Sequence, residues 1–142
     1  MKIKLLNDRA QIPSRGSDDA AGYDIYAANI CAVDIAPGTC EKIPTGIATE
    51  IPNGYYVAIF PRSGAATKRG LRLANCVGVI DSDYRGEWFI PIYNDSDKIQ
   101  RIYAGDRIAQ AILMKYETTD FEVSVELSET ERNDGGFGHS GR

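Results

Sequence analysis

Most of the chain consists of segments in which hydrophobic and polar positions alternate with a period of two, or of short apolar runs, bounded by Gly, Pro, Asn and Asp. The runs lie at residues 1–6, 54–61, 74–80, 87–93, 98–103, 106–114 and 121–127. This alternation is typical of strands with one buried face. Many short strands at such spacing indicate an all-β sandwich, jelly roll or barrel.

One segment favours a helix instead. Residues 63–71 read SGAATKRGL, with Ser63 as a capping residue at the front and Gly70 as a stop signal. We expect about two helical turns here.

The pattern changes again near residue 128. The sequence SETERNDGGFGHSGR has no strand alternation, and four of its last eight residues are glycine. We therefore expect a β-barrel domain over residues 1–127 and a flexible arm over residues 128–142. The run 121–127 should form the last strand of the domain, with its apolar side chains on one face.

Composition limits the setting and the partners. The 142 residues suffice for one domain, no run reaches the roughly 18 apolar residues of a membrane helix, and residues 1–11 lack a signal-peptide pattern. The three cysteines lack metal or disulfide spacing and are expected to be buried thiols. A cytoplasmic location is expected (for a viral protein, the host-cell cytoplasm or nucleus). The net charge of −4 argues against nucleic-acid and membrane partners.

The first chemical candidate lies in NCVGVIDSDYRGEWFIPIY, residues 75–93, which we interpret as two strands with a tight connection. Asp81 directly follows an apolar run that should be buried, so its carboxylate should be rigid and partly desolvated. Such a group can orient a water and accept its proton. The alternative is a turn aspartate that bonds its own backbone. Gly78 within a strand favours close approach to the backbone.

A second candidate begins at Pro61, in FPRSGAATKRG. Arg62, Ser63 and Gly64 lead into the expected helix, whose free N–H groups and positive dipole end can bind phosphate. A plain helix cap explains the same residues equally well. The Walker spacing is absent.

Two polar residues interrupt apolar strands. Gln110 lies between Ala109 and Ala111, where an amide must find hydrogen-bond partners. Those partners are either the backbone of a neighbouring loop or a ligand at the strand end. Asp24 interrupts an aromatic run after Gly22 and should point into a polar environment.

The tail carries two residues that are unusual in a glycine-rich segment, Phe137 and Arg132. If the tail closes over a ligand, the Phe137 ring would stack on the ligand and the Arg132 guanidinium would reach a charged group of it. Mobile arginines of this kind accelerate some phosphoryl transfers roughly 10³- to 10⁵-fold. The alternative is an idle, solvated tail.

Five stretches resemble, in order and spacing, the motifs of the trimeric dUTP pyrophosphatases (dUTPases): AGYDIYA, PRSG, NCVGVIDSDYRGE, GDRIAQ and RNDGGFGHSG. They cover nearly the whole chain, and five motifs in register are highly specific. The resemblance implies a distorted jelly-roll β-barrel (β-clip) with one short helix and a flexible glycine-rich arm. It also implies a homotrimer whose active sites draw on all three chains: residues 75–86 of one, the stretches of Asp24, Ser63 and Gln110 of a second, and the arm of the third.

The resemblance further implies how the nucleoside is bound. Uracil pairs with strand backbone groups and with Asn75, and Gly78 leaves room for the base; the substrate-binding residues of this segment are Asn75, Gly78, Val79 and Ile80. Tyr84 lies under the deoxyribose, where a 2′-hydroxyl would clash, and bulk at the 5-position of the base is refused. Asp81 matches the aspartate that activates the water.

The same resemblance assigns the phosphate and arm contacts. The phosphate-contacting positions match Arg62, Ser63, Gly64 and Gln110. Mg²⁺ is held by the phosphates and water, with Asp24 reaching it through a water at most. The arm contributes Arg132, Phe137, Gly138 and Ser140. Phe137 stacks on uracil and Arg132 reaches the γ-phosphate. His139 and Asn133 depart from the small hydroxyl residue and the glycine usual there, which leaves the role of His139 open.

The implied reaction is attack of an activated water on the α-phosphate of dUTP, giving dUMP and pyrophosphate. It keeps uracil out of DNA and supplies dUMP for dTMP synthesis. A dCTP deaminase of the same fold is the nearest rival, but it needs a glutamate acid/base that the 75–93 stretch does not obviously supply. A zinc deaminase is excluded because His139 is the only histidine. A non-catalytic module or structural trimer is the alternative from another class.

Overall fold

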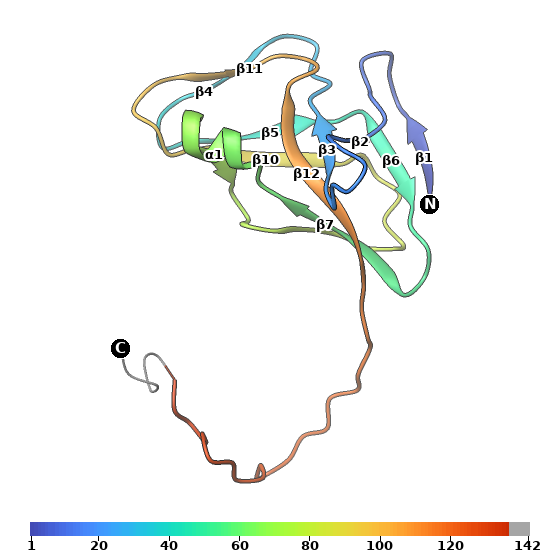
Figure 1. The fold of residues 1–142 in the computed structure, drawn as a ribbon, viewed down its shortest axis with the longest axis vertical. Coiled ribbons are helices and arrows are strands. Elements are labelled where there is room, and N and C mark those ends of the chain that lie inside the picture. Colours follow the sequence, from blue (N-terminus) through green and yellow to red (C-terminus); the bar gives the residue numbers. More distant parts are fainter. Residues whose placement is uncertain (137–142) are drawn as a thin grey trace.

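The computed structural model describes residues 1–136. Its elements, in chain order, are β1 (Lys2–Leu5), β2 (Ser14–Arg15), β3 (Tyr23–Tyr26), β4 (Val33–Ile35), β5 (Cys40–Pro44), β6 (Ile47–Glu50), β7 (Tyr55–Phe60), α1 (Ser63–Arg69), β8 (Leu71–Leu73), β9 (Gly78–Ile80), β10 (Phe89–Asn94), β11 (Gln100–Ile102) and β12 (Arg107–Lys115) (Figure 1). The structure is thus nearly all-β with one short helix, as the sequence predicts.

The strands form four antiparallel sheets. The largest has the order β2-β3-β12-β7-β9, a second has the order β5-β10-β8, and two pairs join β1 with β6 and β11 with β4. In Figure 1 the long strand β12 crosses the molecule, with β7 and β3 as its hydrogen-bonded neighbours. Crossovers between distant strands, rather than sequential hairpins, bring the functional segments together.

The core lies between these sheets and follows the alternation in the sequence. In β10, Ile90 and Ile92 are buried, whereas Phe89 is exposed on the opposite face. Trp88, just before this strand, is the bulkiest of the fully buried side chains. The second sheet therefore presents one face to the core and one face outward, and the outward face borders the candidate site.

The predicted helix is present as α1, and Gly70 ends it with a left-handed backbone (φ 64°). The predicted cap is wrong. Arg62 occupies the N-cap position and no side chain caps the helix, because Ser63 is already the first helical residue. Within residues 1–136, no helix is long and apolar enough to span a membrane.

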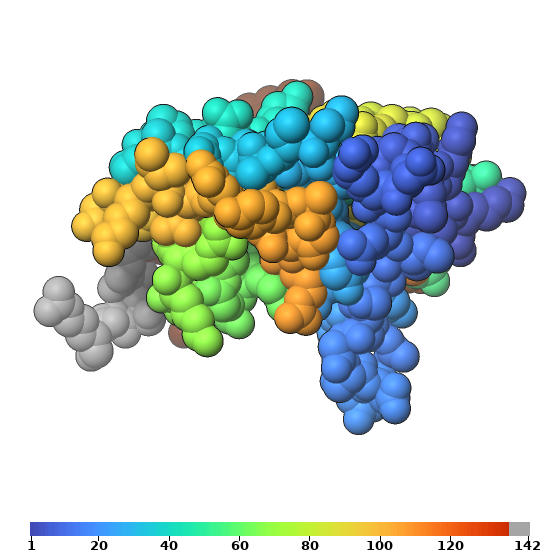
Figure 2. Space-filling view, turned by 90° about the horizontal axis from the view of Figure 1, so that it is seen from above, coloured from blue at the N-terminus to red at the C-terminus, as the bar shows by residue number. Residues whose placement is uncertain are grey.

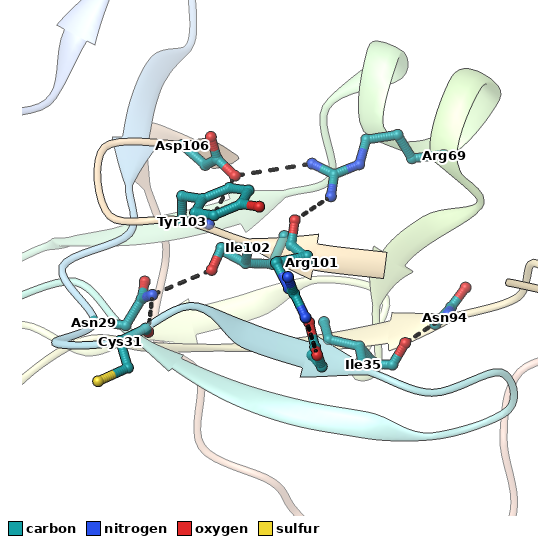
Figure 3. A network of polar contacts seen from close by, with 10 residues as sticks. Asn29, Cys31, Ile35, Arg69, Asn94, Arg101, Ile102, Tyr103 and Asp106 are labelled. Carbon is teal, nitrogen blue, oxygen red and sulfur yellow. Dashed lines mark hydrogen bonds and ion pairs between the residues drawn. The ribbon is translucent and has the colours of Figure 1, made fainter. Parts of the chain in front are cut away.

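A polar network anchors the C-terminal end of α1 to the β11–β4 pair (Figure 3). Arg69 donates to the carbonyl of Arg101 at 2.6 Å and lies 4.0 Å from the Asp106 carboxylate. Arg101 in turn donates to Asp34 at 2.5 Å, and this charged hydrogen bond holds the pKa of the Asp34 carboxyl below its usual range. Figure 2 shows the packing from another side, with α1 (green) against the segment around residues 100–110 (orange). The helix that follows Arg62 is therefore fixed at both its start and its end.

The predicted strand 74–80 is mostly wrong. Only Gly78–Ile80 form a strand, β9, because the chain turns before it, with Cys76 in a left-handed conformation (φ 61°). Val77 and Val79 are not buried but 42% and 58% exposed. The two arms of the 75–93 stretch do not pair with each other: β9 pairs with β7, whereas β10 pairs with β5 and β8. The connection between them therefore spans two sheets.

The predicted strand 121–127 is absent. The last strand, β12, ends at Lys115, and the chain then leaves the folded body as the orange-red segment of Figure 1. The side chains of its apolar face are at least 90% exposed: Phe121, Val123, Val125 and Leu127. Alternation creates an apolar face, but a strand also needs a partner strand, and no strand within residues 1–136 pairs with this segment.

The three cysteines are exposed, so the prediction of buried thiols is wrong. Cys31 follows β3 in a loop, Cys40 begins β5, and Cys76 lies in the turn before β9. The preference of cysteine for burial is statistical, and loop and strand-end positions override it here.

Candidate active site

Arg62 is held by an acidic residue from a neighbouring strand. Asp24 on β3 accepts from Arg62 Nε at 2.8 Å with one oxygen and from Arg107 Nη1 at 3.2 Å with the other. Its side chain is 14% exposed, which matches the predicted polar environment. Because a guanidinium has five N–H donors, each arginine keeps donors free for an anion. Asp24 thus places two cations side by side.

Gln110 fixes the backbone of the same loop. Its Nε2 donates to the carbonyl of Pro61 at 2.9 Å, so the first of the two predicted partners, a loop backbone, is the one that the structure shows. Gly22 makes room for this amide, since a Cβ there would lie 2.6 Å from Gln110 Oε1. Gln110 therefore positions the residue directly before Arg62.

The 74–88 segment surrounds two adjoining hollows. The first has a volume of about 240 Å³, and its walls include Asn75, Gly78, Val79 and Ile80. The second measures about 250 Å³, and its walls include Val79, Ile80, Asp81 and Tyr84. All six residues predicted to contact the nucleoside or the attacking water are thus brought together.

Glycine is required at two places in this segment. A Cβ on Gly78 would lie 3.2 Å from the Ile59 side chain, which is tight for a strand pair. A Cβ on Gly86 would collide with the hydroxyl and ring of Tyr84, which donates to the carbonyl of Glu87 at 3.0 Å. A side chain at position 86 would therefore displace the Tyr84 ring, which lines the second hollow.

Asp81 is exposed, so the expected partial desolvation is wrong for the single chain. Its carbonyl accepts the turn hydrogen bond from the Tyr84 backbone N–H at 3.2 Å. Within residues 1–136 no hydrogen bond or ion pair engages its carboxylate, so the alternative of a side chain bonded to its own turn is not what the structure shows. The carboxylate faces the second hollow with both oxygens available to a water.

The two halves of the site lie apart in one chain. In the antiparallel β7–β9 pair, Ile80 is opposite Val57. Asp81 therefore continues toward the start of β7, whereas Arg62 follows its end. About six residues of extended chain, or roughly 20 Å, separate the two positions. One chain therefore holds the two halves of the site well apart.

Comparison with known proteins agrees with this geometry. A family model described as dUTPase matches residues 8–141. A deoxyuridine 5′-triphosphate nucleotidohydrolase of Finegoldia magna is 46% identical over 99% of each chain. A dUTPase mutant of Staphylococcus bacteriophage 80alpha, solved with dUpNHpp, superposes with a TM-score of 0.90 at 31% identity, covering 99% of this chain and 98% of that one. The chain belongs to the dUTPase family. The predicted distorted jelly-roll fold is confirmed by the same likeness.

A third relative bears on the metal. A mutant dUTPase from phage phi11 of S. aureus, described with a structural Mg(II) ion, has a TM-score of 0.78 at 28% identity and covers 88% of this chain and 96% of that one. Within residues 1–136 of the present dUTPase, no group of three or more His, Cys, Asp or Glu side chains is placed to hold a metal.

The arm of the dUTPase is described only in part. Arg132 is exposed and donates to the carbonyl of Gly135 at 2.7 Å, within a local turn. The predicted contacts of Phe137, Gly138 and Ser140 lie outside the described residues.

Three residues near the site were missed by the sequence analysis. Arg107 stands within the GDRIAQ motif, but its pairing with Asp24 depends on strand register. Glu87 lines the second hollow, yet its Oε1 accepts from the Gly46 backbone N–H at 2.7 Å, which gives it a structural role. Lys42 comes from β5, and nothing in the local sequence marks it.

Proposed function

We propose that the chain hydrolyses dUTP to dUMP and pyrophosphate, and thereby removes dUTP from the pool for DNA synthesis and supplies dUMP for dTMP synthesis. The observation that carries this proposal is the pair of adjoining hollows. The first is lined by Asn75, Gly78 and mainly apolar residues, which suit a pyrimidine, and the second is lined by Asp81, whose carboxylate has no partner within residues 1–136. The Asp81 carboxylate accepts a proton from the water while the water oxygen attacks the α-phosphorus, and pyrophosphate leaves.

The phosphates would be held by the cluster around Arg62. Arg62 and Arg107 present free N–H donors, and the start of α1 at Ser63 and Gly64 adds backbone donors. Bound Mg²⁺ would polarise the phosphoryl oxygens and neutralise developing charge. The residues fit a metal carried by the triphosphate, because both oxygens of Asp24 are engaged by arginines. Any contact of Asp24 with the metal would pass through a water.

We propose a homotrimer with shared sites. The separation of Asp81 from Arg62 supports the sharing, since the two can meet on one triphosphate only if they come from different copies. The exposed apolar face of residues 121–127 supports contact between copies as well. It is complemented by an apolar groove of about 330 Å³ whose walls include Ile3, Ile12, Val57 and Leu113. Three points stay predictions: that residues 1–127 form the barrel domain, that residues 128–142 form the closing arm, and that the enzyme is cytoplasmic.

Complementation tests the shared site. We expect Asp81→Asn and Arg62→Ala to be nearly inactive alone, and the co-expressed mixture to recover about a quarter of wild-type kcat, because with random assembly a site that takes the two residues from different chains is intact in one arrangement of four. Activity is measured on the purified mixture, with each variant alone as the control. No recovery in verified mixed trimers would contradict sharing of these two residues.

Substrate profiling tests the function itself. A coupled pyrophosphate assay with Mg²⁺ is run on dUTP, dCTP, dTTP and UTP, with ammonia measured in parallel. Pyrophosphate from dUTP alone supports the proposal. Ammonia from dCTP would support a deaminase instead. Release of neither pyrophosphate nor ammonia from any of the four nucleotides would support a non-catalytic module.

Tyr84 should select the sugar. We expect Tyr84→Ala to raise kcat/KM for UTP relative to dUTP roughly tenfold, because removal of the ring opens space for a 2′-hydroxyl. Tyr84→Phe is the matched control, since it keeps the ring and loses only the bond to Glu87. An unchanged UTP/dUTP ratio in Tyr84→Ala would place sugar selection elsewhere.

A further inference from the structure

Lys42 lies opposite the 74–88 segment, on the outward face of the second sheet (β5-β10-β8). It is paired with Pro91 in the β5–β10 register, and Phe89 lies two residues earlier in β10 and so on the same face. Lys42 Nζ is 5.3 Å from the centroid of the Phe89 ring. The neighbouring Ile43 is fully buried and fixes the backbone of β5. The ammonium is thus attached to a rigid strand and rests against an aromatic surface.

The lysine borders both hollows. Lys42 and Phe89 line the first hollow together with Asn75 and Gly78, and they line the second together with Asp81. They come from β5 and β10, whereas the other three residues belong to the 74–88 segment. A pyrimidine in the first hollow would therefore have the 74–88 segment along one edge and the ammonium near another.

The positive charge of Lys42 is not paired with a neighbouring carboxylate among the described residues. Within residues 1–136 its ammonium makes no ion pair and no side-chain hydrogen bond. An ammonium has three donors and no acceptor. It can therefore bond a carbonyl oxygen of a base but can only oppose an amino group.

We propose that Lys42 is a specificity residue of the base site, which donates to the 4-carbonyl oxygen of uracil and opposes the 4-amino group of cytosine. The inference rests on the proposed function and deepens it. Uracil and cytosine differ at position 4, where uracil accepts a hydrogen bond and cytosine donates one. A cation at this edge favours uracil twice, through the bond that it gains and through the donor–donor contact that it imposes on cytosine. Phe89 acts as the support that orients the ammonium.

Binding of products tests the proposal without catalysis. Dissociation constants are measured by calorimetry for dUMP, dCMP and the deoxynucleotide of 2-pyrimidinone, whose base lacks any group at position 4. We expect Lys42 to contribute about tenfold to the tighter binding of dUMP over the pyrimidinone nucleotide, the lower end for a hydrogen bond to a charged group, because Lys42 is exposed. In Lys42→Met the difference in affinity should therefore narrow about tenfold, with affinity for the pyrimidinone nucleotide unchanged. The difference that remains reflects N3, which carries a proton in uracil but not in 2-pyrimidinone.

Two variants serve as controls. Lys42→Arg keeps a donor and should retain most of the difference in affinity, and Lys98→Met removes an exposed lysine that lines neither hollow and should change nothing. The ratio of the dissociation constants for dUMP and the pyrimidinone nucleotide decides the role of Lys42. If this ratio is the same in Lys42→Met as in the wild type, the inference about Lys42 is wrong and the proposed function still stands. A wild-type protein that binds none of these nucleotides, nor an imido analogue of dUTP, would overturn the proposed function with it.

Discussion

Asp81→Asn is expected to lower kcat for dUTP by roughly 10²- to 10⁴-fold, the range that a positioned general base contributes. Asparagine has the same shape but cannot accept the proton of the attacking water. Affinity for the nucleotide should be nearly unchanged, because no described residue depends on the Asp81 carboxylate for a hydrogen bond. Single-turnover rates with dUTP and calorimetry with a non-hydrolysable analogue measure the two effects separately.

Asp83→Asn is the matched control for this variant. Asp83 lies two residues further along, is exposed, and is not among the residues that line either hollow. It should therefore keep wild-type kcat and KM. If Asp81→Asn retained most of its rate, the assignment of the base would be wrong. If both variants lost activity equally, a general charge effect of the segment would explain the loss.

Truncation after Thr130 is expected to lower turnover by about 10³-fold, in line with the effect of arginines delivered by mobile segments. The variant loses Arg132 and Phe137, which are predicted to close on the γ-phosphate and the base. The fold should not change, since the last strand ends at Lys115 and the apolar face 121–127 is retained. Melting temperature and oligomeric mass verify the fold, and the pyrophosphate assay measures turnover.

Arg132→Ala in the full chain separates the guanidinium from the rest of the arm. It should reproduce most of the loss if charge delivery is the main role of the arm, and little of it if stacking by Phe137 dominates. A truncated protein with unimpaired turnover would refute closure of the arm over the substrate.

The sequence predicts those elements whose cause is local. The helix after Arg62 and its end at Gly70 follow from residue preferences, and β7 and β12 follow from short apolar runs. The need of Gln110 for a partner also follows, because an amide between apolar neighbours costs free energy unless it is bonded. That this partner is the Pro61 carbonyl depends on register, which pairs Gln110 with Phe60 across β12 and β7.

What the sequence does not predict is partner choice over long distances. Residues 121–127 alternate more regularly than β12, yet within residues 1–136 only β12 pairs with neighbouring strands. Val79 alternates correctly but faces a hollow instead of the core. Lys42 is a charged residue on an exposed strand face, and only the folded chain places it beside Phe89. These are consequences of tertiary packing that local propensity cannot encode.

The most direct test of the account is a crystal structure of the full chain with Mg²⁺ and the imido analogue of dUTP. We expect uracil in the first hollow, between Gly78 and Lys42, a water held by Asp81 in line with the α-phosphorus, and Arg62 of another copy on the phosphates. An analogue bound elsewhere, with the first hollow empty in every copy, would contradict it.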